Sequence, residues 1–250
     1  MRYMGGKSRI AKQLIEVWEP FLAQSAGYIE PFLGGGSVMS HVQHTNRIGS
    51  DSHVALMNMW KAIKQGWELP KHNVTKAEYL RLKAEQDPKD PMTAFVGFGL
   101  CFGGKYFASF TVGECNYASH AHASIKRLNI KTIKLMTRDY EAYSPEEYKN
   151  YVIYCDPPYE NTMPYKGTRA FDYDRFYQWA RLVSSHNKVF ISSYAAPADF
   201  IPVLEINVPL HMGHYKKRTT EKLFCYERYW PQWELERLLI LYKRGLTSSP

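Results

Sequence analysis

The 250-residue chain has the length of one domain, or of one domain with a sizeable insertion. Hydrophobic residues make up 45% of it, which excludes a chain that is disordered throughout. Its net charge of +8 favours a polyanionic partner such as nucleic acid, although any basic soluble protein has the same balance.

The chemistry of the four cysteines and the lack of long apolar runs limit the compartment. No two cysteines form a CxxC pair, so we expect reduced thiols rather than a disulfide framework. No run approaches the roughly 20 apolar residues that span a bilayer. We therefore expect no membrane association, no signal peptide and a cytoplasmic protein, in a bacterial cell or a phage-infected host.

The first part of the chain alternates strand-like and helix-like segments. Hydrophobic spacing and glycine positions predict, in order, a helix over residues 8–22, a strand over 27–31, a glycine turn over 34–36, a helix over 38–44 capped by Ser37, a strand over 47–51 and a helix over 54–66. This order is typical of a parallel α/β sheet.

The middle of the chain breaks this rhythm and then restores it. Helical stretches at 76–84 and 91–100 surround a glycine- and aromatic-rich segment, which indicates an inserted subdomain. The predicted division is a catalytic domain over 1–68 and 129–250 and a mostly helical insertion over 69–128. Later predicted elements are strands over 131–136, 151–155, 188–193, 203–208 and 223–226, a helix over 173–186 and a frayed end over 245–250.

The strongest local signal is the tetrapeptide Asp156-Pro157-Pro158-Tyr159, directly after the predicted strand 151–155. Ligands of open α/β sheets bind beyond the carboxyl ends of strands. The Asp156 carboxylate and a proline carbonyl can accept the two N–H bonds of an aromatic amine and stabilise positive charge on its nitrogen. Tyr159 can stack on an extruded base. The alternative is a plain strand-ending turn.

Two further segments suit a cofactor. Glycines follow the first strand after Glu30, and Asp51 ends the next strand about 20 residues later, where an acidic residue typically binds ribose hydroxyls. The run lacks the full GxGxxG spacing, so a dinucleotide is not favoured. At the start of the chain Gly5, Gly6 and Lys7 precede a helix and suit an anion such as a carboxylate. Taken alone, these could be an ordinary turn and a frayed terminus.

These three segments, in this order, resemble the DNA adenine methyltransferases of the Dam type (class alpha, the D12 class). The resemblance extends from residue 2 to about 227 and is weakest in the middle. It implies a Rossmann-like methyltransferase fold that uses S-adenosylmethionine, with the insertion recognising the target. The implied reaction is site-specific methylation of the N6 of a flipped adenine in double-stranded DNA, without a metal.

The resemblance also implies the site residues. The cofactor set is Tyr3, Gly6, Lys7, Glu30, Phe32, Gly34, Asp51, Asp139 and Asp156, and the catalytic set is Asp156, Pro157, Pro158 and Tyr159. Within the cofactor set, Asp51 falls on the ribose contact and Asp139 on the adenine contact. The family often has tryptophan where this chain has Tyr3. The asparagine- and arginine-rich stretch of enzymes that read GATC is missing, so we do not infer that specificity.

Several basic and aromatic residues are candidates for DNA contact. The candidate DNA-binding residues are Lys105, Tyr106, Lys126, Arg127, Lys216, Lys217 and Arg218. Lys131 could also meet a phosphate, and Phe107 could enter the duplex beside Tyr106. Alternatively the aromatic residues form the core of the insertion, and the basic stretch 214–218 is a solvated loop. His120 and His122 lack a third ligand, so we expect no metal site.

Three alternatives stay open at this point. N4-cytosine methylation poses the same electronic problem, but serine is the commoner residue at the aspartate position of the resembling cytosine enzymes. Methylation of RNA or of protein glutamine is another alternative, and a non-catalytic DNA-binding protein that keeps the fold is the third. We expect a monomer or weak dimer that acts as a stand-alone modifier or in a restriction–modification pair.

Overall fold

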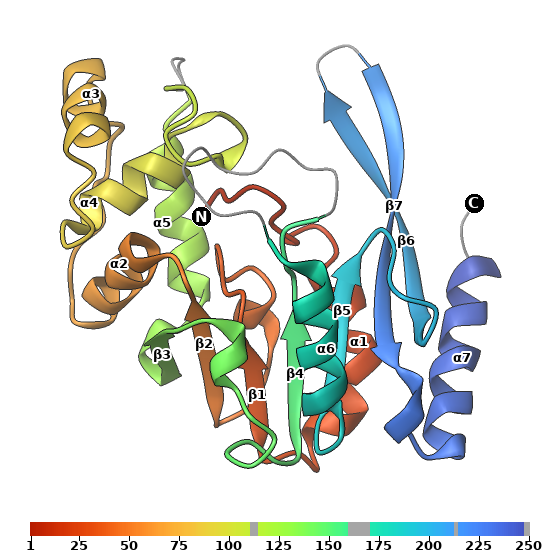
Figure 1. Ribbon diagram of the computed structural model, residues 1–250. Coiled ribbons are helices and arrows are strands. Elements are labelled where there is room, and N and C mark those ends of the chain that lie inside the picture. Colours follow the sequence, from red (N-terminus) through yellow and green to blue (C-terminus); the bar gives the residue numbers. More distant parts are fainter. Residues whose placement is uncertain (111–114, 160–170, 213–214, 248–250) are drawn as a thin grey trace. The chain divides into compact units, whose positions relative to one another are not determined.

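The computed structural model describes residues 1–110, 115–159, 171–212 and 215–247 (Figure 1). The strands are β1 (Gly27–Glu30), β2 (Arg47–Asp51), β3 (Ile133–Thr137), β4 (Tyr151–Cys155), β5 (Lys188–Ser193), β6 (Phe200–Met212) and β7 (Tyr215–Tyr226). They form one seven-stranded sheet in the order β3-β2-β1-β4-β5-β7-β6. This order confirms the predicted Rossmann-like α/β class.

The direction of the strands shows where such a sheet binds ligands. β1 pairs with β4 in parallel, and β4 pairs with β5 in parallel, whereas β7 runs antiparallel to β5 and to β6. Strand order reverses between β1 and β4, and Ile29 lies opposite Ile153. Both strands therefore end at the same edge of the sheet, and Asp156 follows β4 at this switch point.

The helices of the described residues do not alternate strictly with the strands, because several follow one another between β2 and β3. They are α1 (Ala11–Leu22), α2 (Val54–Lys64), α3 (Lys76–Glu85), α4 (Pro91–Ala94), α5 (Tyr117–Arg127), α6 (Tyr173–Ser184) and α7 (Gln232–Thr247). A π-helical turn, η2 (Phe95–Gly99), continues α4 directly, so the predicted helix over 91–100 is one helical run with two geometries.

The chain divides into two compact units. Among the described residues, unit 1 comprises Met1–Ala11 and residues 30–110 and 115–140, and unit 2 comprises Lys12–Ile29 and residues 141–159, 171–212 and 215–247. Unit 1 contains every predicted cofactor residue except Asp156, and unit 2 contains the Asp156–Tyr159 motif. The predicted boundaries of the insertion, 69–128, fall inside unit 1, and a separate recognition subdomain stays a prediction.

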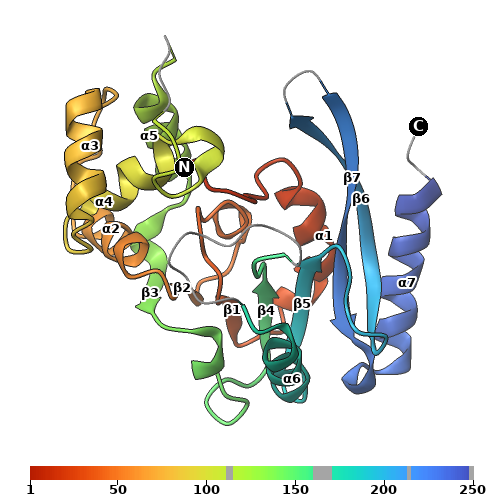
Figure 2. The same cartoon turned by 45° about the horizontal axis from the view of Figure 1, so that its top comes forward.

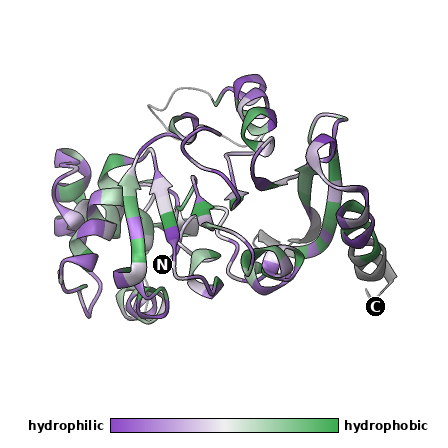
Figure 3. Cartoon of the chain, turned by 90° about the horizontal axis from the view of Figure 1, so that it is seen from below, coloured by the Kyte–Doolittle hydropathy of each residue, from purple (hydrophilic) through white to green (hydrophobic). Residues whose placement is uncertain are grey.

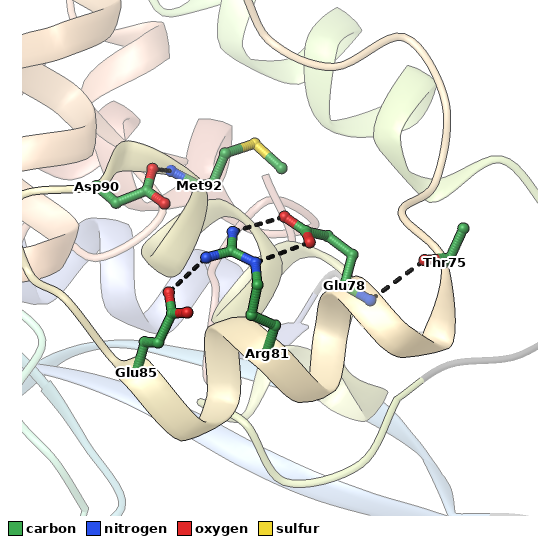
Figure 4. Close-up of polar contacts among 6 residues, drawn as sticks. All are labelled: Thr75, Glu78, Arg81, Glu85, Asp90 and Met92. Carbon is green, nitrogen blue, oxygen red and sulfur yellow. Dashed lines mark hydrogen bonds and ion pairs between the residues drawn. The ribbon is translucent and has the colours of Figure 1, made fainter.

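Helices of the insertion stand together in unit 1, as both Figure 1 and Figure 2 show for α3, α4 and α5. The hydroxyl of Thr75 caps α3, where Arg81 forms ion pairs with Glu78 and Glu85 (Figure 4). The Asp90 carboxylate accepts the Met92 N–H and starts α4. Local caps and i,i+3 or i,i+4 pairs thus define the exposed helix α3, whose sequence has little apolar periodicity.

Aromatic packing dominates the core of unit 2. The fully buried Trp18 of α1 packs against Tyr28 of β1, Tyr154 of β4 and Phe190 of β5. Helix α7 packs on β6. Hydrophobic and hydrophilic residues alternate along α7, which runs to the C label in Figure 3. Helices α1 and α7 of this unit therefore both pack on strands of the sheet.

Three element predictions are wrong. Ser37 does not cap a helix, because its hydroxyl accepts the N–H of Lys7 at 3.1 Å and only a 3-10 turn, η1 (Met39–His41), follows. Lys216, Lys217 and Arg218 fall on β7 rather than in a loop, although their side chains lie outside the described part of the chain. Residues 245–247 continue α7 and are not frayed, while 248–250 lie outside the described residues.

Three possible features are absent from the described ranges. No helix there is long and apolar enough to cross a membrane. Cys101, Cys115, Cys155 and Cys225 are all free thiols. No group of three or more His, Cys, Asp or Glu side chains is arranged to hold a metal ion among the residues that the structure describes.

Candidate cofactor and catalytic site

Tyr3 lies against the glycine turn that contains Gly34. A Cβ atom built on Gly34, whose φ is +47°, would lie 2.8 Å from Cε1 of Tyr3. A Cβ atom on Gly104, with φ +70°, would lie 2.7 Å from the Tyr3 backbone. Only glycine allows both approaches, so the N-terminal segment passes between the glycine turn and the insertion.

The glycine turn is fastened to the end of β2. The Leu33 N–H donates to the Ser50 carbonyl at 2.8 Å, and the Gly34 N–H donates to Oδ2 of Asp51 at 3.1 Å. The Gly34 carbonyl accepts the indole N–H of Trp60 at 3.0 Å. The turn therefore has a fixed backbone conformation beside the carboxylate that is predicted to bind ribose.

Asp51 is a buried carboxylate that two backbone groups hold. Its second oxygen, Oδ1, accepts the His53 N–H at 2.9 Å. Burial raises its pKa to about 6, the two N–H donors oppose the rise, and the charge of Asp139 adds to it. The predicted ribose and adenine contacts are thus close enough to interact electrostatically. Groups with strongly shifted pKa values concentrate at functional sites.

An aromatic cluster that local patterns did not reveal lies beside Asp51. The His53 ring packs edge-on against Phe98 and Tyr106, with centroids 5.1 and 4.8 Å apart, and Phe98 also contacts Tyr3. His53 Nδ1 accepts the Leu56 N–H and caps α2, and burial lowers the pKa of this histidine. A neutral ring that caps a helix thus connects the insertion to the carboxylate site.

The other predicted cofactor residues of unit 1 are also placed by specific contacts. The Lys7 side chain is buried, and its Nζ donates to the Gly5 carbonyl at 2.9 Å. Glu30 is buried near Arg47. Burial lowers the pKa of Arg47, and the charge of Glu30 partly offsets this lowering. Phe32 stacks on Tyr140, with centroids 5.5 Å apart, while Gly6 donates its N–H to the Tyr3 carbonyl.

In unit 2 the motif Asp156–Tyr159 leaves β4 at the ligand-binding edge. Pro157 is buried and Pro158 is exposed, while Asp156 and Tyr159 are half-buried. The Tyr159 hydroxyl donates to the Glu221 carboxylate on β7, and its ring meets Tyr194, with centroids 4.7 Å apart at 79°. Sequence analysis missed Glu221 and Tyr194, because they lie 62 and 35 residues further along the chain. The placement of Asp156 beside Lys7, Gly34 and Asp51 stays a prediction.

The candidate DNA contacts differ in exposure. Lys126 and Arg127 are exposed in the last turn of α5, and Lys131 is exposed, while Lys105 and Tyr106 are half-buried. Phe107 is 6% exposed and packs against Tyr79 and Tyr106, so it belongs to the core. Phe102, at 73%, is the most exposed of the described large hydrophobic residues. The DNA roles stay predictions.

Comparison with known proteins supports the resemblance. Residues 3–95 match the family of D12 class N6 adenine-specific DNA methyltransferases, which confirms the predicted family over this stretch. The stretch holds Tyr3, Lys7, Gly34 and Asp51. No curated protein matches the chain significantly.

One solved structure with a weak likeness is described as a "putative methylase", HI0767 from Haemophilus influenzae. It is 11% identical, with a TM-score of 0.37, over 87% of this chain and 88% of that one. A TM-score this low carries no functional conclusion. The family match is therefore limited to residues 3–95, and the sheet shows the fold.

Proposed function

We propose that the protein transfers a methyl group from S-adenosylmethionine to the N6 of a flipped adenine in double-stranded DNA. One observation carries this proposal. The Asp51 carboxylate joins the turn at Gly34 to the start of α2 through two backbone N–H groups, inside the stretch that matches the adenine methyltransferase family.

The residues of unit 1 fit the cofactor in their chemistry. Gly34 leaves its backbone accessible, the Asp51 carboxylate can accept ribose hydroxyls, and Asp139 can accept from the adenine amino group. Lys7 supplies a positive charge for the amino-acid carboxylate. When bound, S-adenosylmethionine provides an electrophilic methyl group on a sulfonium centre.

The residues of unit 2 then act on the target amine. The Asp156 carboxylate and the carbonyl of Pro157 or Pro158 accept its two N–H bonds, which localises the lone pair and stabilises the charge that develops on nitrogen. Tyr159 stacks on the extruded base. The methylated nitrogen is acidic and loses its extra proton to solvent, so the chain needs no dedicated base. Alignment of the reactants supplies most of the rate enhancement.

Transfer of tritiated methyl groups to duplex DNA tests the proposal. We expect incorporation by the wild-type protein and a loss of more than about 100-fold in Asp156→Ala, because one of the two acceptors disappears. Asp172→Ala, which removes the helix-capping carboxylate of α6, is the control for a general loss of acidic charge. Equal incorporation by wild type and Asp156→Ala would end the proposed role.

N4-cytosine methylation is the nearest alternative, because that amine has the same delocalised lone pair. Digestion of the labelled DNA and identification of the modified nucleoside separates the two reactions. Label in N4-methylcytosine would replace the adenine assignment. If the chain is instead a non-catalytic DNA-binding protein, calorimetry should detect no binding of S-adenosylmethionine. If RNA or protein takes up the label and duplex DNA does not, the proposed substrate is replaced by that molecule.

A further inference from the structure

Tyr159 is held at two points, both within unit 2. Its hydroxyl donates to Oε1 of Glu221, and its ring stands nearly perpendicular to the ring of Tyr194. A phenol that is held at its hydroxyl and packed against a second ring has little rotational freedom. The three residues come from three places: the end of β4, the segment after β5 and the middle of β7.

Glu221 occupies an unusual position for an acidic residue. It is 7% exposed, and it lies on β7 opposite Ile206 of β6. Burial of a carboxylate is costly unless hydrogen bonds compensate for it. The neighbouring Lys222 forms an ion pair with Glu205, at 2.8 Å. The bond from Tyr159 is therefore one of the contacts that make this buried carboxylate tolerable.

The surrounding charges fix the direction of this hydrogen bond. Burial and the charges of Asp156 and Glu221 raise the pKa of Tyr159 well above its ordinary value. The phenol thus keeps its proton throughout the physiological range and remains the donor, with the Glu221 carboxylate as the acceptor. The Tyr159 phenol therefore does not ionise near neutral pH.

We propose that Glu221 is a positioning residue, which holds the phenol of Tyr159 so that one ring face stays available for the extruded base. This inference rests on the proposed function and extends it to a residue outside the Asp156–Tyr159 motif. A stacking ring gains affinity for a base when it is held in the bound orientation beforehand, because less conformational entropy is then lost.

A double-mutant cycle between Tyr159 and Glu221 tests the proposal. We expect Tyr159→Phe and Glu221→Ala each to lower kcat/KM for methyl transfer to DNA by about tenfold or more, the usual effect of losing a hydrogen bond to a charged group. Because both changes remove the same contact, the double variant should be no slower than the slower single variant. Glu221→Gln keeps an acceptor oxygen and should retain most of the activity.

A second readout separates positioning from folding. DNA with 2-aminopurine at the target base becomes fluorescent when that base leaves the stack, and we expect the signal to fall in Tyr159→Phe and Glu221→Ala but not in Glu221→Gln. Glu205→Ala is the control, because it removes a carboxylate of the same hairpin that forms an ion pair with Lys222 and not with Tyr159. It should leave both readouts unchanged.

The outcomes distinguish the two claims. Two results with an active wild type would overturn the role of Glu221 and leave the methyltransferase assignment intact. The first is a double variant whose loss of kcat/KM is the product of the two single losses. The second is a Tyr159→Phe variant with the fluorescence and the kcat/KM of the wild type. A wild type that transfers no methyl group to DNA would end both. If Glu221→Ala does not fold, Tyr159→Phe and Glu221→Gln still decide, since neither removes buried carbon.

Discussion

Gly34 has a conformation and a neighbour that no other residue accommodates. Its φ is +47°, and an added Cβ would meet the Tyr3 ring at 2.8 Å. We expect Gly34→Ala to destabilise the protein by about 2–4 kcal/mol, from backbone strain of about 1 kcal/mol plus displacement of Tyr3. Affinity for S-adenosylmethionine should fall with it. Denaturant unfolding and calorimetry measure the two effects.

Gly103 is the matched control for this substitution. Its φ is +63°, but no atom lies within 4 Å of an added Cβ. Gly103→Ala should therefore show only the backbone strain, about 1 kcal/mol, and normal cofactor affinity. Equal destabilisation by the two substitutions would show that the Tyr3 contact contributes nothing.

Asp51 should make cofactor binding dependent on pH. Its pKa is raised to about 6, and in the proposed complex the ionised carboxylate is the form that accepts a ribose hydroxyl. We expect the affinity for S-adenosylmethionine to be constant above about pH 7 and to fall roughly tenfold per pH unit below 6. Calorimetry from pH 5 to 8 tests this. The Asp51→Asn variant lacks the titrating carboxylate but still has His53. It should bind S-adenosylmethionine weakly, and this affinity should not change over the same pH range.

The raised pKa of Asp51 also makes folding stability depend on pH, but here the protonated form is the favourable one. The folded protein binds this proton more tightly than the unfolded chain does, whose aspartate has a pKa of about 3.9. Without cofactor, Asp51 therefore stabilises the fold below about pH 4, and that contribution disappears as the pH rises through 6.

A wild-type cofactor affinity that stays constant down to pH 5 would contradict the proposed ribose contact.

At the residue scale, the sequence identifies contiguous motifs and misses their distant partners. The Asp156 tetrapeptide, the turn at Gly34 and Asp51 each carry a local pattern. Glu221 and His53 carry none, because an acidic residue in a strand and a histidine before a helix are ordinary until the fold brings them to Tyr159 and Asp51. Ser37 misled for the same reason, since its hydroxyl partner is Lys7, 30 residues away.

At the element scale, strands of the parallel part of the sheet were predictable and some helices were not. Predicted bounds of β4 and β5 agree with the structure, because largely buried strands of this kind are short apolar runs between turns. Helix α5 was missed because its buried face has one large apolar residue, Ile125, beside the small residues Ala118 and Ala121. The long strands β6 and β7 extend beyond their predicted bounds, where residues 206–212 of β6 pair with residues 215–221 of β7.

The insertion contains a buried and an exposed phenylalanine five residues apart, which allows a direct comparison. Phe107→Ala should cost about 3–5 kcal/mol in the free energy of unfolding, because the residue packs in the core against Tyr79 and Tyr106. Phe102→Ala should cost less than about 0.5 kcal/mol, since its side chain is exposed. Thermal and denaturant unfolding measure both. If the two substitutions lowered the free energy of unfolding equally, Phe107 would not be a core residue of the insertion.

At the scale of the whole molecule, the charge of +8 should appear as salt-dependent DNA binding. Lys126 and Arg127 are exposed side by side on α5, so we expect Lys126→Gln/Arg127→Gln to weaken binding of any duplex sequence. If each contacts one phosphate, the slope of log K against log salt should become shallower by about 2, at roughly 0.9 for each contact.

The pair Arg228→Gln/Arg237→Gln is the control, because it removes the same charge from exposed positions that are not predicted to contact DNA. Titrations at several salt concentrations should leave its slope close to that of the wild type. If both double variants lose the same slope, net charge alone drives binding, and α5 is no part of a defined interface. If only the α5 variant loses it, the insertion contacts the phosphate backbone, and the sequence preference must come from residues other than Lys126 and Arg127, since phosphate contacts carry no base information.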